Sequence, residues 1–346
     1  MTGSLALVLV ILIGFSNAKK VKDNDDKLIA VALMFRHGDR TIITTYPNDP
    51  YKDLKYWPEG FGQLTNRGVE RIKTFGKWFK RKYEEILPTN FGEMYFQSTN
   101  SDRTRNSSKY FISELYDDEK WQNVIKVLPW QENYYLKWNK TCNKYIEAKT
   151  RYIKYLINNL PEDFDGIFDY CTEKTGKKAV DLLYFENLHG VLENEEEERN
   201  LTLPDWTGKI YPNKTQYLSF LSFSSHSGLP ILAKLANGPL FDLIINNFEN
   251  NTYKLMAFAC HDTQISNILK TFNSFHDIPK YAASIIFELH QTKSMGKYIN
   301  ILYKEDDNIR PIILENCTKN CDLKQFKEVL KPFTLTPEQW NQECTN

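Results

Sequence analysis

An unbroken apolar run of eight residues, Leu28–Phe35 (LIAVALMF), constrains the fold of this chain more than any other feature of the sequence. A strand with one face in water alternates apolar and polar residues, whereas a continuous apolar run is typical of a strand that is covered on both faces. A second, mostly apolar run follows at Tyr253–Cys260 (YKLMAFAC). The two runs therefore predict buried strands of a parallel sheet that lies between layers of helices.

The segments around these runs alternate between helix and strand patterns. Thr65 can cap a helix that buries one face, because apolar residues then recur at steps of three and four residues. These residues are Val69, Ile72, Phe75 and Phe79. The other segments with such patterns are a strand at Glu93–Ser98, helices around Arg103–Leu115 and Thr263–Phe272, and strands at Ser284–His290 and Tyr298–Tyr303. The last two strands predict a hairpin at the edge of the sheet.

Residues 130–240 depart from this alternation. They are rich in Tyr and Lys, include a predicted helix at Glu147–Asn159, and carry the acidic run Glu193–Glu198, which we interpret as a solvated loop. The sequence thus predicts an α/β fold with a mixed, mostly parallel central sheet and helices on both faces, formed by residues 19–129 and 241–346. A smaller, mainly α-helical insertion domain is predicted at residues 130–240.

Residues 1–18 have the character of a secretory signal peptide. The apolar run Leu5–Phe15 is followed by small residues, Ser16 and Ala18, at the positions that a signal peptidase reads. The run is too short to span a bilayer, and the alternative is a buried N-terminal strand or helix. Since no later apolar run reaches 18 residues, we expect no membrane attachment after cleavage.

Composition agrees with a secreted globular protein. The 44 Lys and Arg residues balance 44 Asp and Glu residues, which argues against a nucleic-acid partner. Acceptor triplets for N-glycosylation occur at Asn106, Asn139, Asn200, Asn213, Asn250 and Asn316. The cysteines are Cys142, Cys171, Cys260, Cys317, Cys321 and Cys344, and an oxidising compartment would pair them in three disulfides.

The sequence Arg36-His37-Gly38-Asp39-Arg40 stands directly after the first apolar run. Open α/β sheets bind ligands at the carboxyl ends of their strands. Arginine is well suited to bind phosphate, and a histidine between two cations keeps a neutral, nucleophilic nitrogen. The sequence therefore predicts a phosphate site with His37 at its centre. The alternative is a strand end with ion-paired arginines and a packed histidine.

Two further segments place polar residues after strands. His261-Asp262 follows the second apolar run, and Arg103 lies in Ser98–Thr104, at a predicted helix start that favours anions. Taken alone, the His-Asp pair is as often structural, and an arginine such as Arg103 is more often a surface residue. Cys317 and Cys321 have a spacing that is seen in metal sites, but no histidine lies near them, so a local disulfide is expected.

Together these segments resemble the histidine acid phosphatase family, in the branch of the prostatic and lysosomal acid phosphatases. The resemblance covers nearly the whole mature chain. It implies that His37 is the nucleophile, that Asp262 donates a proton and later acts as a base, and that four cations bind the phosphoryl group. These are Arg36, Arg40, Arg103 and His261. The implied reaction is hydrolysis of small phosphomonoesters at acidic pH, without a metal or another cofactor.

The resemblance also bears on source and disulfides. Tyr46–Tyr51 and Tyr281–His290 are most similar to secreted acid phosphatases of insect venom, so an extracellular location, as in venom, is expected before a lysosomal one. Prostatic-type relatives carry a disulfide at the positions of Phe185 and Ser284, where both cysteines are missing. The resulting hypothesis is that the extra cysteines, Cys171 and Cys260, pair, alongside the bonds Cys142–Cys344 and Cys317–Cys321. The alternative for Cys260 is a buried thiol.

Other functions stay open at this point. A phytase-like inositol polyphosphate phosphatase would use the same nucleophile, although Thr41-Ile42 replaces the x-Pro that some phytases carry. A non-catalytic secreted binding protein is a second alternative, and a metallohydrolase is a weak third, because no H-E-x-x-H spacing occurs. His189 and His226 either border the substrate pocket or have structural roles. Relatives are often dimers, which makes a homodimer one possible state by analogy alone, and the sequence does not decide the oligomeric state.

Overall fold

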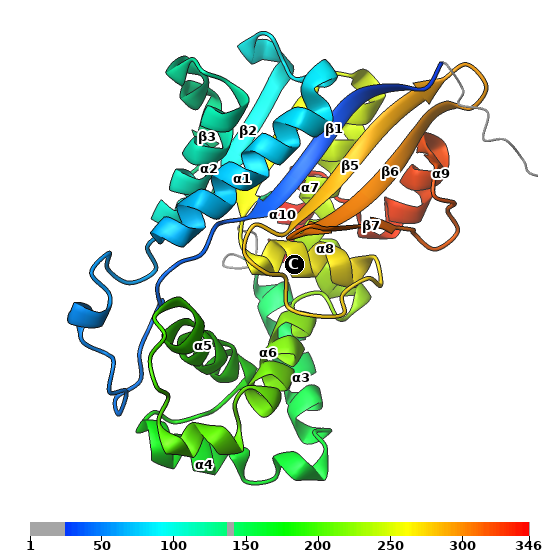
Figure 1. Cartoon of the computed structure of the whole chain (residues 1–346). Helices are drawn as coiled ribbons and strands as arrows, with labels where there is room; N and C mark the ends of the chain where they lie inside the picture. The colour runs from blue at the N-terminus through cyan, green and yellow to red at the C-terminus, as the bar shows by residue number, and fades with distance from the viewer. Residues whose placement is uncertain (1–24, 137–141, 346) are drawn as a thin grey trace, which may run out of the picture.

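The computed structural model describes residues 25–136 and 142–345. The predicted signal peptide and the glycosylation triplet at Asn139 lie outside these residues. The described chain forms an eight-stranded sheet in the order β3-β2-β4-β1-β5-β6-β7, with β8 paired to β6 (Figure 1). The strands are β1 (Lys27–Arg36), β2 (Met94–Ser98), β3 (Ile125–Val127), β4 (Leu255–Cys260), β5 (Ser284–Thr292), β6 (Gly296–Glu305), β7 (Asn308–Ile312) and β8 (Cys321–Asp322).

The sheet has a parallel half and an antiparallel half. Strands β3, β2, β4 and β1 are parallel neighbours, whereas β5, β6, β7 and β8 pair in antiparallel fashion beyond β1. The predicted mixed α/β fold is therefore confirmed. The predicted hairpin of β5 and β6 lies further from the edge than expected, because β7 pairs with the outer side of β6.

Helices cover both faces of the sheet, as the apolar run in β1 predicts. Alternate residues of a strand point to opposite faces, so Val31, Leu33 and Phe35 pack against the helices α1 (Asn66–Tyr83) and α2 (Asp102–Leu115). The residues between them, Ala32 and Met34, belong to the core on the other face. That core includes residues of α7 (Pro230–Asn250), α8 (Asp262–Thr271) and α9 (Leu323–Leu330).

A group of helices lies below the sheet in the view of Figure 1. These helices are α3 (Asn143–Asn158), α4 (Ile167–Thr175), α5 (Leu182–Glu193) and α6 (Asn213–Ser225). They have a hydrophobic core of their own, in which Phe185 and Leu218 are fully buried. Trp57 and Tyr46, from the loop after β1, pack into the same core. The loop thereby ties the sheet to the helical region beside the end of β1.

Helix α7 links the two regions. Its first turns pack against α3 and α10 (Pro337–Thr345) through Leu232 and Leu235, whereas Phe241 and Ile244 lie in the core of the sheet. The expected boundary at residue 240 therefore falls inside one continuous helix. No single helix in the described ranges is long and apolar enough to cross a membrane. Helices α6 and α7 have the necessary length and apolarity only when they are taken together, and the pair is bent by 69°.

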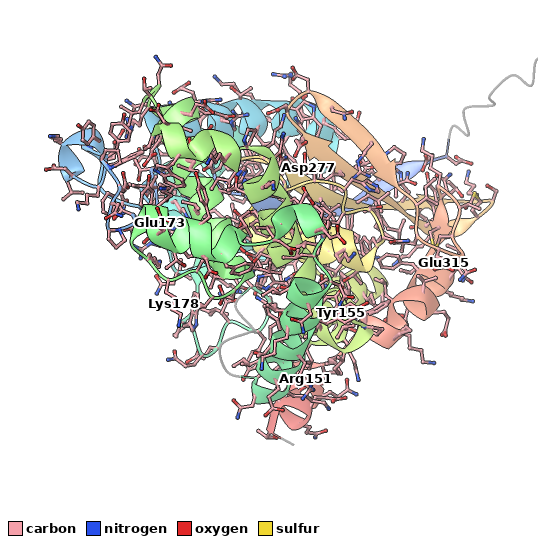
Figure 2. All side chains as sticks on the ribbon, turned by 90° about the horizontal axis from the view of Figure 1, so that it is seen from below. Arg151, Tyr155, Glu173, Lys178, Asp277 and Glu315 are labelled. Carbon is pink, nitrogen blue, oxygen red and sulfur yellow. A yellow bond between two sulfur atoms is a disulfide. The ribbon has the colours of Figure 1, made fainter. Side chains whose placement is uncertain are left out.

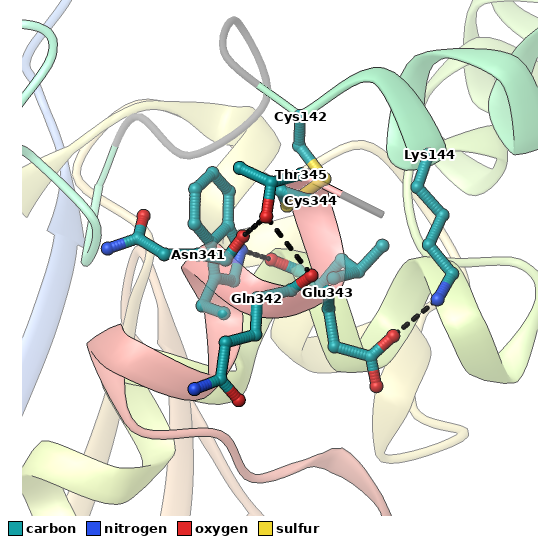
Figure 3. Close-up of a disulfide and its surroundings, with 9 residues drawn as sticks. Cys142, Lys144, Asn341, Gln342, Glu343, Cys344 and Thr345 are labelled. Atoms are coloured by element: carbon teal, nitrogen blue, oxygen red, sulfur yellow. Dashed lines mark hydrogen bonds and ion pairs between the residues drawn. A yellow bond between two sulfur atoms is a disulfide. The ribbon is translucent and has the colours of Figure 1, made fainter.

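Two disulfides are present in the described chain. Cys142 bonds to Cys344 with an S–S distance of 2.02 Å, which ties the start of α3 to the end of α10 (Figure 3). Lys144 and Glu343 form an ion pair beside this bond. Cys317 and Cys321 form the second, local disulfide. These are two of the three bonds that the resemblance implied.

The third bond of that hypothesis, Cys171–Cys260, is wrong. Cys171 is in α4 and is buried in the core of the helical region, whereas Cys260 ends β4 in the core of the sheet. The Sγ of Cys260 donates to the carbonyl of Phe35 over 3.4 Å. The two side chains lie in separate cores and do not meet, and burial raises the pKa of the Cys171 thiol to about 12.

The interpretation of Glu193–Glu198 as a solvated loop is also wrong. Glu193 is the last residue of α5, and Asn194–Glu198 continue it as one turn of π-helix. Glu195 is 0% exposed, and Glu193 lines the main cavity. Composition alone suggested solvation, but the helix turns individual carboxylates of the run toward the interior.

Candidate active site

The carboxyl ends of three adjacent strands supply the predicted site residues. β4 lies between β1 and β2, and both neighbours are parallel to it. The backbone amide of His37 donates to Cys260 over 3.1 Å, and that of Thr99 donates to Ala259 over 3.2 Å. Parallel pairing therefore brings the residues that follow β1, β2 and β4 to one edge of the sheet.

Gly38 is required by a close approach of two backbone segments. A Cβ at residue 38 would lie 2.3 Å from the carbonyl oxygen of Gly68, in the first turn of α1. Gly68 is restricted in the same way, since its Cβ would lie 2.1 Å from the carbonyl oxygen of Asp39. The two glycines let α1 begin directly against the loop that carries His37, and no larger residue fits at either position.

His37 is buried, at 1% exposure, and is held as a neutral ring. Its Nδ1 lies 2.8 Å from the carbonyl oxygen of Gly38, an acceptor only, so the proton is on Nδ1. Nε2 then carries the lone pair, and Nε of Arg103 donates to it over 3.1 Å. Burial, together with the nearby charges of Arg103 and other cations, lowers the pKa of His37 well below its ordinary value.

Arg36 is fixed by three different contacts. Its guanidinium donates to the Asp262 carboxylate over 2.8 Å and to the carbonyl of Pro279, and lies 4.1 Å from the ring centroid of Tyr281. Burial opposes the charge on Arg36, but Asp262 and other negative groups outweigh it, so the arginine pKa is raised. Arg36 therefore stays charged in a buried position beside His37.

Arg103 and His261 complete the predicted cluster. Arg103 is in the first turn of α2, and its Nη2 lies 3.4 Å from Nδ1 of His261. Nε2 of His261 is 2.9 Å from the hydroxyl of Thr99. Burial and the charge of Arg40 lower the pKa of Arg103 to about 10, so it is still protonated at acidic and neutral pH.

Asp262 begins α8, beside this cluster. Burial raises the pKa of its carboxyl group, but Arg36, Arg40 and the backbone amide of Thr263, 2.8 Å from Oδ1, reverse that effect. The net pKa of Asp262 is lower than usual. Asp262 is therefore a counter-ion of the arginines and carries no proton at mildly acidic pH.

The cluster borders a cavity of about 390 Å³ that is lined by residues of the loop after β1, of α5 and of the segment before β5. Arg36, Arg40 and Asp262 are part of its wall, as is His189 of the expected border residues. His226 does not line this cavity; its ring contacts Nζ of Lys149, 2.9 Å away. The structure thus brings all six predicted site residues together and separates the two histidines whose roles were open.

Sequence reasoning missed several residues of the cavity wall. Tyr281 packs over Arg36, and Glu186 and Glu193 of α5 face the cavity. Glu186, Gly190 and Glu193 recur at helical spacing, a signal that could have placed the two carboxylates on one face. Among the described residues, no group of three or more His, Cys, Asp or Glu side chains is arranged to hold a metal ion.

A buried neutral imidazole among arginines at the ends of parallel strands defines a site for binding and transferring a phosphoryl group. The model of the family described as histidine phosphatase superfamily (branch 2) matches residues 19–304. The chain belongs to this family, and it is a phosphatase enzyme.

The chain is similar to curated acid phosphatases over nearly its full length. Prostatic acid phosphatase of Rattus norvegicus is 29% identical, with 99% of this chain and 95% of the relative covered. Lysosomal acid phosphatase of Homo sapiens is 27% identical, with 99% and 86% covered. Among solved structures, a phytase of Klebsiella sp ASR1 has a TM-score of 0.69 at 14% identity, covering 90% of this chain and 98% of the phytase, and it shares the fold.

Proposed function

We propose that this protein is a secreted acid phosphatase that hydrolyses phosphate monoesters through a phosphohistidine at His37. The observation that carries the proposal is the state of the His37 ring: Nδ1 is bound to the carbonyl of Gly38, and Nε2 is an unprotonated nitrogen among arginines. Such a nitrogen can attack phosphorus, since it has a free electron pair and is not lost to protonation at acidic pH.

In the first step, Nε2 of His37 forms a bond to phosphorus while the bond from phosphorus to the ester oxygen breaks. The leaving oxygen takes a proton from Asp262, so that an alcohol departs. Arg36, Arg40, Arg103 and His261 stabilise the charge on the phosphoryl oxygens. In the second step, water attacks phosphorus, Asp262 takes its proton, and the bond to Nε2 breaks to release phosphate.

Asp262 must gain a proton for the first step, although its resting pKa is low. The causes of that low pKa are the positive charges of Arg36 and Arg40. A bound phosphoryl group neutralises these charges, so the pKa of Asp262 rises on binding and an acidic medium supplies the proton. Activity at acidic pH is therefore expected, because binding of the phosphoryl group lets Asp262 hold the proton that the leaving oxygen needs.

Secretion is supported by the two disulfides and by the position of the glycosylation triplets. Asn200, Asn213, Asn250 and Asn316 are exposed, whereas Asn106 is half-buried in α2. Occupied triplets, a cleaved signal peptide, the venom source and a homodimer stay predictions. An inositol polyphosphate as the main substrate is disfavoured, because carboxylates outnumber Lys and Arg side chains along the cavity wall.

Phosphate release from p-nitrophenyl phosphate and phytate, measured at about pH 4 to 6 with and without EDTA, tests the proposal. Wild type is expected to hydrolyse p-nitrophenyl phosphate equally well with EDTA, and His37→Ala is expected to lose activity by several orders of magnitude. Activity that EDTA removes, or that survives in His37→Ala, would show that the mechanism is wrong. A folded wild type without activity on any ester would favour the binding-protein alternative.

A further inference from the structure

Helix α5 passes directly beside the proposed phosphate site. A Cβ at Gly190 would lie 3.9 Å from Nη2 of Arg40, so the helix backbone comes close to this guanidinium. Residues three and four apart share one face of a helix. Glu186, His189 and Glu193 therefore lie on the same side as Gly190, and all line the cavity. This face of α5 is therefore one part of the wall that surrounds the cavity beside Arg40.

The cations of the cavity wall outside the phosphate site are already paired. Arg67 and Arg71 both bind Asp39, at 3.3 and 2.7 Å. Arg71 also binds Asp306 at 2.6 Å, and Lys280 binds the same carboxylate at 3.2 Å. These side chains therefore add little net positive charge to the outer cavity.

Four carboxylates of the same wall have no such partner. Within residues 25–136 and 142–345, no salt bridge involves the cavity-lining side chains Glu186, Glu193, Glu197 and Asp277. Glu186 accepts from the hydroxyl of Ser222 over 2.6 Å, and Asp277 accepts from the backbone amide of Ile278 over 2.7 Å. Burial raises the pKa of Glu186 to about 7 and also raises that of Glu193, which weakens the negative charge of these two groups in acidic medium. Glu197 and Asp277 are then the unpaired carboxylates that make the outer cavity negative.

His189 adds a hydrogen-bond acceptor to this wall. The hydroxyl of Thr215 donates to the carbonyl of Pro212, so its oxygen accepts from Nδ1 of His189, 3.0 Å away. Nε2 is then unprotonated, and no hydrogen bond within the described chain reaches it. His189 is 8% exposed and lines the cavity. Burial lowers the pKa of His189 to about 4, so the ring is neutral in mildly acidic medium.

From these contacts we infer that the outer cavity is a subsite for a primary ammonium group, so that the preferred substrates are phosphate monoesters of amino alcohols. The inference rests on the proposed function. A primary ammonium group has three donors and a positive charge, which the acceptor of His189 and the unpaired carboxylates can satisfy. An ester with a negative leaving group meets the same carboxylates as a repulsive surface.

Three esters of similar size test the subsite. O-Phosphoethanolamine carries the ammonium group, n-propyl phosphate has a methyl group in its place, and phosphoglycolate has a carboxylate. The measurement is kcat/KM for phosphate release from each ester. Wild type is expected to prefer the amine over the propyl ester by about tenfold, since each partly exposed charge pair contributes up to about fivefold. Phosphoglycolate is expected to be the poorest of the three.

Variants separate the subsite from the intrinsic reactivity of the esters. The double variant Glu197→Gln/Asp277→Asn is expected to lower the amine-to-propyl ratio by about threefold to fivefold. Glu315→Gln is the matched control. Figure 2 shows Glu315 at a different part of the surface from Asp277, and this variant is expected to keep the wild-type ratio. His189→Leu should lower the ratio, and His189→Gln, which retains an acceptor, should restore part of it.

Charge reversal provides a gain of function. Glu197→Lys/Asp277→Lys is expected to raise the phosphoglycolate-to-propyl ratio, which a merely misfolded variant would not do. The inference is overturned if the amine-to-propyl ratio is the same in wild type and in all of these variants, or if phosphoglycolate is hydrolysed as well as the amine. If neither these esters nor p-nitrophenyl phosphate are hydrolysed, the proposed function itself fails.

Discussion

Two buried carboxyl groups outside the active site are expected to make the stability of the fold depend on pH. Asp49, in the loop after β1, is 2% exposed, and Glu195, in the turn after α5, is 0% exposed. Oδ1 of Asp49 accepts from the backbone amide of Tyr51 over 2.6 Å, whereas its Oδ2 and both Glu195 oxygens have no donor in the described structure. A hydrogen bond between the two carboxyl groups, in which one of them keeps its proton, therefore satisfies these buried oxygens.

The magnitude follows from the pKa of Glu195. Burial and the neighbouring charge of Asp49 raise this pKa from 4.5 to about 9. Between these values the folded protein holds a proton that the unfolded chain releases, so the free energy of unfolding falls as pH rises. The slope is about 1.4 kcal/mol per pH unit, which amounts to a loss of about 3 kcal/mol between pH 4.5 and pH 7.

Glu195→Gln tests this reasoning, because the amide keeps a donor toward Asp49 without titrating. Equilibrium unfolding in urea, followed by tryptophan fluorescence at several pH values from about 4.5 to 7.5, gives the free energy of unfolding of each protein. We expect the advantage of Glu195→Gln over wild type to grow by about 3 kcal/mol across this range. Exposed Glu315→Gln is the control. A difference between Glu195→Gln and wild type that does not change with pH would refute the reasoning.

Three further predictions concern proton transfer, a buried ion pair and a thiol. Asp262→Asn should lower kcat/KM for alkyl phosphates about 10²- to 10⁴-fold, and much less for p-nitrophenyl phosphate, whose leaving group needs no proton; equal losses of kcat/KM in a leaving-group series would contradict this role. Burial opposes the Glu288 charge, but His290, Lys82 and Tyr83 lower its pKa from 4.5 to about 2. The charged Glu288 therefore stabilises the fold above pH 4.5, and this stabilisation is lost as pH falls through about 2. Glu288→Gln should lower the free energy of unfolding at pH 7 by about 3 kcal/mol, as measured in urea. An unchanged midpoint of unfolding would show that Glu288 does not stabilise the fold in this way. Cys171 should react with a maleimide only after unfolding, as peptide mass analysis would reveal, because its thiol is buried with a pKa of about 12; rapid labelling of the native protein would be inconsistent with that core.

The sequence predicted those parts of the fold that depend on local pattern. The eight apolar residues before Arg36 identify a strand buried on both faces, and Thr65 does cap α1, where its hydroxyl accepts from Gly68. Strand ends also predicted that Arg36, His37, His261 and Asp262 share one edge of the sheet. The resemblance, more than the pattern of residues around Arg103, predicted that this arginine belongs to the site.

Other features depend on contacts between distant segments, which no local pattern contains. The Cys171–Cys260 hypothesis failed because an alignment of two missing and two extra cysteines does not show which hydrophobic core each side chain enters. Glu195 was assigned to a solvated run, although a single turn of π-helix buries it against Asp49. Tyr281 lies 4.1 Å from Arg36 only because the loop before β5 returns to the end of β1.

The covalent intermediate is the most direct test of the account. Asp262→Asn, mixed with p-nitrophenyl phosphate and quenched within a single turnover, slows hydrolysis of the phosphoenzyme and allows it to accumulate. Mass analysis of the peptides is expected to find the phosphoryl group on His37, and to find none when His37 is replaced by alanine. A phosphoryl group on another residue, or a full turnover rate in His37→Ala, would contradict the central claim.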